Sequence, residues 1–237
     1  MEPIIRLSIG KTVALLSVCV VMLTVAGFVS EYDALQSSPS DFNLENVRGL
    51  GRLFNLAGEA NIPAWYKSST LLLCSFFLFT IAAARRRDSS SYWSYWRDLG
   101  IVFLLLSVDE IAVIHRGLGL QLSAALQTTG FLYYAWVLVG IAFVALLSVF
   151  YAGFLKSLPV MPMYLFLFSG TTYVASALGL KMIEGWYLNR YGQGSLLFIS
   201  LIVIRQFGEM ASIVVFIYSL LSYMRYNVED TLIRVVE

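Results

Sequence analysis

Six apolar segments, each close to the length that crosses a lipid bilayer, constrain the fold of this chain more than any other feature. A transmembrane helix needs about 20 predominantly apolar residues. Because 59% of the 237 residues are hydrophobic and only 13% are charged, a soluble domain of this size is excluded. We therefore predict an all-α, polytopic membrane bundle of six transmembrane helices, with one domain over residues 1–237 embedded in the lipid bilayer. The segments lie at about 12–30, 68–84, 99–119, 130–153, 160–182 and 195–223.

The placement of lysine and arginine predicts the orientation of these helices, because cytoplasmic loops carry an excess of both. With the N-terminus inside, nine basic residues fall on the cytoplasmic side and six on the outer side. The run Arg85–Arg87, directly after the second segment, is the strongest single indication. We therefore expect both termini in the cytoplasm and the chain in an inner (plasma) membrane. The first segment is also compatible with a cleaved signal peptide, but its run from 12 to 30 exceeds the usual 7–15 residues, so a retained helix is expected.

The longest stretch outside the membrane is an outer loop over residues 31–67. Apolar residues recur at helical spacing over about 44–56, which predicts a short amphipathic helix on the membrane surface. Pro63 suits the first turn of a helix, so it is expected to start the second span or a turn leading into it.

Several classes of function are excluded by what the sequence contains. A formal charge of +1 argues against nucleic acid as a partner. The two cysteines, Cys19 and Cys74, both lie in apolar runs and read as core residues. A haem held by two histidines is excluded because His115 is the only histidine.

Two adjacent carboxyl groups, Asp109 and Glu110, fall near the middle of the third apolar segment, and His115 follows them. An ionisable side chain at that depth costs roughly 2.5–3.5 kcal/mol on insertion scales, and such residues usually line a bundle interior or a water-filled cavity. Arg205 and Glu209 of the last segment reach a similar depth, given a rise of about 1.5 Å per residue. Further polar groups lie toward the outer side of the membrane, namely Glu184, Glu59 and Asn61. We expect all these groups to converge on an outward-facing cavity.

The charges of this cluster appear unbalanced in the sequence. Asp109, Glu110 and Glu209 are offset only by Arg205, and by His115 when it is protonated. Either a bound cation or a protonated carboxyl group would restore the balance. A purely structural reading also stands, in which Arg205 neutralises Glu209 one turn away and Asp109 pairs with Arg205 across helices.

A metal site formed by Asp109, Glu110 and His115 meets a geometric obstacle. At about 100° per residue, His115 differs by roughly 120–140° in helical angle from the two acids, so one regular helix cannot direct all three to a point. Zinc is disfavoured because the chain has no second histidine and no thiolate pair. A divalent cation with oxygen ligands, or no metal, fits better.

The motifs Glu59-x-Asn-x-Pro-x-Trp65, Asp109-Glu-x4-His115 and Glu209-Met210 resemble those of uncharacterised bacterial six-helix membrane proteins. The resemblance implies the six-helix fold and points to Glu59, Asn61, Asp109, Glu110, His115 and Glu209, and it implies no activity. An acidic residue would be expected after the histidine, where this chain has Arg116.

We interpret the chain as a multi-pass membrane protein in which buried carboxylates bind a cation or protons, for transport or for sensing. Asp109, Glu110 and Glu209 would be the ligands or proton carriers, Arg205 would set their charge, and the other groups would lie at the mouth. The sequence leaves open an intramembrane, metal-dependent enzyme acting on a lipid or isoprenoid. It equally leaves open a non-catalytic subunit or assembly factor, and a homo-oligomer or larger membrane complex.

Overall fold

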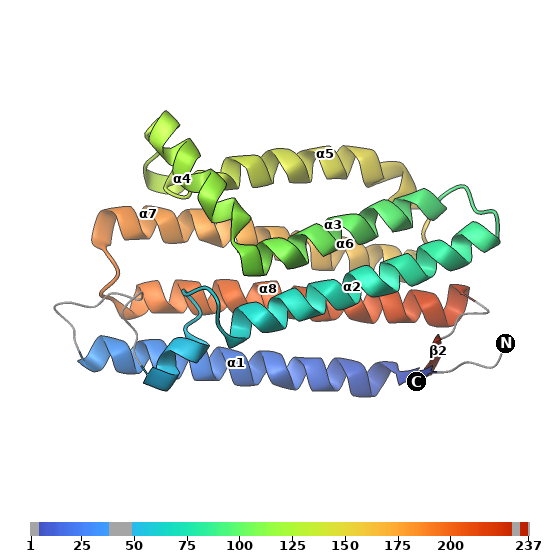
Figure 1. Ribbon diagram of the computed structural model, residues 1–237, viewed down its shortest axis with the longest axis horizontal. Coiled ribbons are helices and arrows are strands. Elements are labelled where there is room, and N and C mark those ends of the chain that lie inside the picture. The colour runs from blue at the N-terminus through green and yellow to red at the C-terminus, as the bar shows by residue number, and fades with distance from the viewer. Residues whose placement is uncertain (1–4, 38–48, 229–232, 237) are drawn as a thin grey trace.

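The computed structural model describes residues 5–37, 49–228 and 233–236, and these residues fold almost entirely into helices that run along one long axis (Figure 1). The all-α class is therefore confirmed. The 3-10 helices are η2 and η3, η4 is a π-helix, and β1 and β2 form a short parallel pair. The elements in chain order are β1 (Ile5–Ser8), α1 (Ile9–Ser37), η2 (Gly49–Phe54), α2 (Ile62–Arg87), α3 (Trp93–Ala112), α4 (Ile114–Leu126), η3 (Gly130–Leu132), α5 (Trp136–Ser157), α6 (Val160–Val174), η4 (Ala175–Leu180), α7 (Lys181–Tyr191), α8 (Leu196–Asn227) and β2 (Ile233–Val236).

Five helical stretches in the described part of the chain are long and apolar enough to cross a membrane. They correspond to five of the six predicted segments, and each extends beyond the predicted bounds at one end or both. The predicted third span differs, because α3 carries four charged residues within its 20 residues. The five stretches are Ile9–Ser37, Ile62–Arg87, Trp136–Ser157, Val160–Tyr191 and Leu196–Asn227.

The third segment is not the single helix predicted over 99–119. It is broken at Val113, which adopts a left-handed conformation with φ of 54° between α3 and α4. The predicted outer loop is also shorter than expected, because Glu31 lies in α1 and Lys67 lies in α2. Of the predicted amphipathic helix over 44–56, residues 44–48 lie outside the described residues, and Gly49–Phe54 is a 3-10 helix instead.

Capping residues explain where two of the long helices begin. The Asn61 side chain caps α2 by accepting a hydrogen bond from Ala64 N at 2.9 Å, and Pro63 lies in the first turn, as expected. Ser195 caps α8 in the same way through Phe198 N at 3.2 Å. These caps fix the N-terminal ends of the helices that carry most of the buried polar groups.

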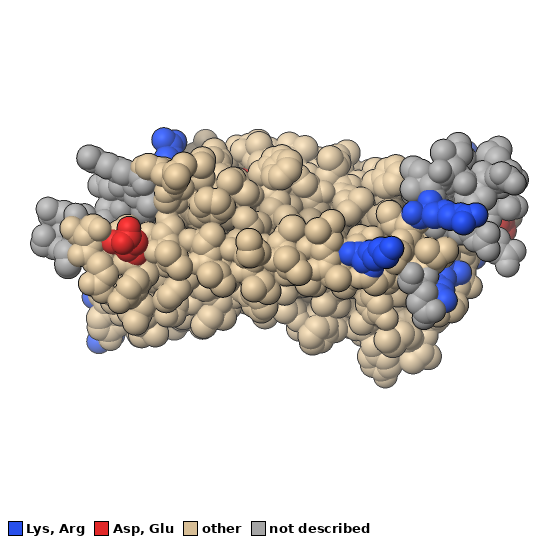
Figure 2. Space-filling view, turned by 90° about the horizontal axis from the view of Figure 1, so that it is seen from below, with Lys and Arg blue, Asp and Glu red and all other residues tan. Residues whose placement is uncertain are grey.

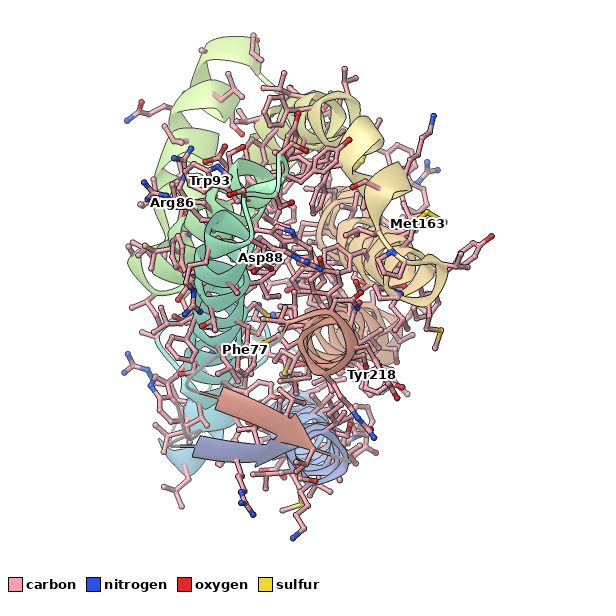
Figure 3. All side chains as sticks on the ribbon, turned by 90° about the vertical axis from the view of Figure 1, so that its right-hand side faces the viewer. Phe77, Arg86, Asp88, Trp93, Met163 and Tyr218 are labelled. Atoms are coloured by element: carbon pink, nitrogen blue, oxygen red, sulfur yellow. The ribbon has the colours of Figure 1, made fainter. Side chains whose placement is uncertain are left out.

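Helix α8 lies at the centre of the bundle, where it packs against α1, α2, α6 and α7, while α2 and α3 form a closely packed hairpin. Seen along the bundle axis, side chains fill the space between the helices (Figure 3). Near the α2–α3 turn, the Arg86 guanidinium lies 4.9 Å from the centre of the Trp93 ring. The half of the interior toward this turn is apolar and aromatic, with Phe77, Trp96 and Phe154 fully buried.

The first and last described elements, β1 and β2, lie at the same end of the bundle as the end of α2 that carries Arg85–Arg87 (Figure 1). Figure 2 shows a face that is almost uncharged along most of its length, with basic side chains mostly toward the end that carries β1 and β2. The opposite end carries η2, α4, α7 and the beginning of α8 (Figure 1).

Candidate functional site

A buried lysine lies at the centre of the polar cluster. Lys67 Nζ is 2.7 Å from Glu110 Oε1 and 2.9 Å from Glu209 Oε2, so one ammonium group joins α2, α3 and α8. The side chains of Lys67 and Glu209 are 7% and 6% exposed, whereas that of Glu110 is 18% exposed. Glu110 is therefore the member of this triad that is most open to the surroundings.

The cluster continues from Glu209 through Arg205 to α7. Arg205 Nη1 is 2.7 Å from Glu209 Oε1, and Arg205 Nε is 2.7 Å from Glu184 Oε2. Lys181 Nζ lies 2.6 Å from Glu184 Oε1, and the Tyr134 hydroxyl donates a hydrogen bond to the same oxygen at 3.3 Å. The result is one ion-pair network that alternates in charge across four helices.

We call this set the ion-pair network and define it by its charged members, Glu110, Lys67, Glu209, Arg205, Glu184 and Lys181. It contains three carboxylates and three basic groups, so it is neutral when every member is ionised. The excess negative charge expected from the sequence is therefore wrong for these six residues. Neutrality matters because an unpaired charge in a low-dielectric interior costs several kcal/mol.

Sequence reasoning missed Lys67 and Lys181, because it counted both among the six basic residues on the outer side of the membrane, Lys67 at the end of the outer loop and Lys181 at the outer end of the fifth span. A usable signal existed for Lys67: it lies four residues after Pro63, one turn into the helix that Pro63 starts. Helix geometry explains why Glu209, the acid that Lys67 contacts, also contacts Arg205. Arg205 and Glu209 are four residues apart on α8, which puts them on one helix face.

The π-helix η4 directly precedes α7 and helps to orient the two network residues of that helix, Lys181 and Glu184. A π-helical turn inserts an extra residue and changes which face of the following helix is directed inward. In α7, Lys181 and Glu184 follow this turn directly, and Glu184 is buried against α8. Helix α8 and η4 approach each other closely there. A Cβ atom at Gly208 of α8 would collide with the side chain of Ser176 of η4, so glycine permits this approach.

Asp109 and His115 form a separate pair on the more exposed side of Glu110. Asp109 Oδ1 accepts a hydrogen bond from the His115 backbone N–H at 2.8 Å, and Asp109 Oδ2 lies 2.7 Å from His115 Nδ1. A regular helix would direct Asp109 and His115 to different faces. The break at Val113 brings the two side chains together. The alternative in which Asp109 pairs with Arg205 is wrong, because Arg205 contacts Glu184 and Glu209.

The remaining predicted residues have mainly structural contacts. Glu59 Oε2 lies 2.9 Å from Arg116 Nη1 at an exposed position. Asn61 is buried, caps α2 and donates from Nδ2 to the carbonyl oxygens of Asn55 and Gly58. Neither residue contacts a member of the ion-pair network through a hydrogen bond or salt bridge that the structure places among its described residues.

Within the described residues, no group of three or more His, Cys, Asp and Glu side chains is arranged to hold a metal ion. Of the three residues considered for a metal, Asp109 contacts His115 and Glu110 contacts Lys67.

The structure also contains an apolar groove of about 390 Å³ between α1 and α8, away from these acids. Val20, Phe207 and Val214 are among its lining residues.

The six charged side chains of the ion-pair network therefore couple α2, α3, α7 and α8 through ion pairs. No curated protein and no solved structure matches the chain. The family described as a domain of unknown function, DUF8692, matches residues 13–224. Because this match covers most of the 237 residues, the chain belongs to that family.

Proposed function

We propose that the chain spans a bacterial inner membrane six times, with α3 and α4 together forming the third crossing and both termini in the cytoplasm. The location of β1 and β2, the first and last described elements, at the end of the bundle that carries Arg85–Arg87 supports this orientation. The burial of Lys67 and the partial burial of Lys181 support it further, because these two of the six basic residues counted as outer lie in helices α2 and α7 and not in loops. The ion-pair network then belongs to the outer half of the membrane.

We further propose that the protein senses protons from the outer aqueous phase through this network. The observation that carries the proposal is the sharing of Lys67 between Glu110 of α3 and Glu209 of α8. One ammonium group that serves two carboxylates can lose one partner and keep the other. That property makes the contact between α3 and the rest of the bundle dependent on the charge of Glu110.

A proton suits this site better than a metal ion. With three acids and three bases the ion-pair network is balanced, so an added cation would have to displace Lys67 or Arg205. A proton requires no such displacement, because it neutralises one carboxylate where it stands. Glu110 is the natural acceptor, since it is the most exposed acid of the network and Asp109 and His115 lie beside it at 29% and 34% side-chain exposure.

The charges that act on Glu110 define the response. The Lys67 ammonium group, 2.7 Å from Glu110 Oε1, favours the ionised form of Glu110, and the negative charge of Glu209 on the same ammonium group opposes it. When the outer pH falls and Glu110 takes up a proton, its attraction to Lys67 is lost and Lys67 pairs with Glu209 alone. The outer end of α3, and α4 beyond it, then lose their ionic link to α2 and α8.

A fixed point lies close to this link. Ser68 Oγ donates to Ser107 O at 2.8 Å, and Ser107 Oγ donates to Ser68 O at 2.8 Å. These reciprocal hydrogen bonds hold α2 to α3 one turn before Glu110. The expected motion is therefore a displacement of α4 about this point, with the apolar half of the bundle unchanged.

The test is a distance measurement between spin labels at Ala124 of α4 and Leu197 of α8, both exposed. The protein would be reconstituted in lipid nanodiscs, with Cys19 and Cys74 replaced by alanine. The distance distribution should broaden or shift as pH is lowered in the wild type. The variant Glu110→Gln should show the low-pH distribution at every pH, because its side chain cannot carry the charge.

Asp88→Asn is the matched control, because Asp88 is an exposed acid at the far end of α2, away from α4, whose change should leave the pH response intact. A distance that does not depend on pH, or a dependence that persists in Glu110→Gln, would overturn the proposal. Either outcome would favour the structural reading, which the complete pairing of the network also supports. In that reading the six residues hold the helices of a non-catalytic subunit together.

A further inference from the structure

A second buried acid lies outside the network, at the outer end of α1. Glu31 has no exposed surface. It faces the segment that follows η2, where Leu56 packs against Gly27, one turn earlier on the same helix. Ser30 adds a hydrogen bond from its hydroxyl to Gly51 O at 2.9 Å, so this segment is fastened to α1 at several points.

Glu31 and Gln206 hold the same peptide group from its two sides. Ala57 N donates to Glu31 Oε1 at 3.1 Å, and Gln206 Nε2 donates to Leu56 O at 2.6 Å. The peptide between Leu56 and Ala57 is thereby fixed between α1 and α8. Each of these two side chains uses one polar atom for the contact and has one left over.

The two remaining atoms are both oxygens, and both are buried. Glu31 Oε2 and Gln206 Oε1 have no hydrogen-bond donor among the described residues. The Leu56 N–H also lies close to the Glu31 carboxyl group, but Oε2 still has no donor. A buried acceptor without a donor costs roughly 1–3 kcal/mol, and more when it is charged. One proton on Glu31 removes the charge and turns an acceptor into a donor.

The charge count points the same way. The charged groups that act on Glu31 are Arg205 of α8 and Glu184 of α7, both members of the ion-pair network. An ionised Glu31 would add a fourth carboxylate beside three basic groups, whereas a neutral Glu31 leaves the network balanced. Arg205 already contacts Glu184 and Glu209, each at 2.7 Å, so it offers Glu31 no direct ion pair.

We infer that Glu31 is a second proton-binding site, which holds a proton at neutral pH while the ion-pair network remains ionised. This protonated acid stabilises the Leu56–Ala57 peptide against α1 and α8. The inference concerns a different residue from Glu110 and holds whether or not Glu110 responds to pH. Loss of the proton would place a bare carboxylate near Glu184 and loosen this segment.

Infrared spectroscopy of the reconstituted full chain tests the inference, because a protonated carboxyl group has a C=O stretch distinct from that of a carboxylate. At pH 7 exposed carboxyl groups are ionised, since their pKa values lie near 4. The wild type should nevertheless show one carboxylic-acid band. The band should be absent in Glu31→Gln and present in both Glu110→Gln and the exposed control Glu59→Gln.

Three results would overturn the inference. The first is the absence of an acid band in the wild type at pH 7, a measurement that does not depend on any variant folding. The second is a band that persists in Glu31→Gln or disappears in Glu110→Gln. The third is loss of the band on adding sodium or potassium chloride, which would assign the site to a small cation.

Discussion

Asp109 holds His115 with both of its oxygens, at 2.8 Å from the backbone nitrogen and 2.7 Å from the ring nitrogen Nδ1. The contact bridges the break between α3 and α4 and gives α4 an acceptor at its beginning. The His115 ring also lies 4.8 Å from the Trp136 ring, which ties the start of α4 to α5. Asp109 thus acts locally as a cap, beside the acid that contacts Lys67.

Replacing Asp109 with alanine should loosen α4 without unfolding the bundle. The change removes a capping acceptor, and such losses cost about 0.5–2 kcal/mol. Amide hydrogen exchange in α4 should therefore accelerate by about tenfold, which corresponds to 1.4 kcal/mol, while exchange in α8 stays unchanged. The control is Asp98→Ala, a partly exposed aspartate of the same helix that forms an ion pair with its neighbour Arg97. Equal effects of the two changes on α4 would contradict the capping role.

Val113 should tolerate glycine better than a regular helical position does. Its φ of 54° is unfavourable for a β-branched residue, at a cost of about 1–3 kcal/mol, which glycine does not incur. Glycine adds a conformational entropy cost of about 0.5–1 kcal/mol. Thermal unfolding in detergent should therefore show Val113→Gly to be stabilised by about 1 kcal/mol.

The matched control for this change is Val108→Gly, at an exposed position inside α3. There glycine should destabilise by roughly 0.5 kcal/mol, because it has a lower helix propensity than valine. If both variants lose stability to the same extent, the left-handed conformation at Val113 does not determine how α3 ends.

The ion-pair network illustrates the difference between local features, which could be predicted from the sequence, and contacts between distant residues, which could not. The helical class, the approximate positions of the five long apolar helices and the common depth of Glu110, Arg205 and Glu209 follow from apolar run length and the helical rise, both of which are local properties. The partner of each acid is not local. Lys67 is separated from Glu209 by 142 residues, and only helix packing brings them together.

The break at Val113 illustrates the same limit. Valine carries no signal for a left-handed conformation, and no glycine or proline interrupts the sequence between Asp109 and His115. What favours the break is the pair of contacts that Asp109 gains from His115, and these exist only once the helix has broken. Glu31 was likewise assigned to a loop, because its polar neighbours ended the apolar run before α1 itself ended.

Removing the charge of Lys67 should be strongly destabilising, and removing one carboxylate with it should restore part of the loss. Breaking a buried ion pair on one side costs about 3–5 kcal/mol, because the remaining charge has no partner. Lys67→Met leaves three acids against two bases, whereas Lys67→Met with Glu110→Gln restores neutrality. The double variant should therefore unfold at a higher temperature than Lys67→Met alone.

Lys156→Met serves as the control for this pair of variants, since Lys156 is exposed at the end of α5 and its replacement should change stability little. A double variant that is less stable than Lys67→Met would show that Glu110 contributes through contacts other than its charge.

Asn61 should reject aspartate, although aspartate is ordinarily as good a helix cap as asparagine. The Asn61 side chain accepts from Ala64 N, but its Nδ2 also donates to Asn55 O at 2.7 Å and to Gly58 O at 2.8 Å. In Asn61→Asp the accepting oxygen remains, while the second oxygen brings negative charge against two carbonyl oxygens at a buried position. The variant should be destabilised by at least as much as Asn61→Ala, on the order of 2 kcal/mol or more.

Ser195→Asp provides the contrast, because the cap of α8 is an ordinary one. The Ser195 side chain is half-buried and accepts from Phe198 N, and its other partner among the described residues is the Tyr187 hydroxyl, which can donate to a carboxylate. Aspartate there should keep the stability of α8 within about 0.5 kcal/mol. Thermal unfolding of the two aspartate variants in the same detergent compares them directly. A stable Asn61→Asp would mean that capping, and not the two donated hydrogen bonds, is the main contribution of Asn61.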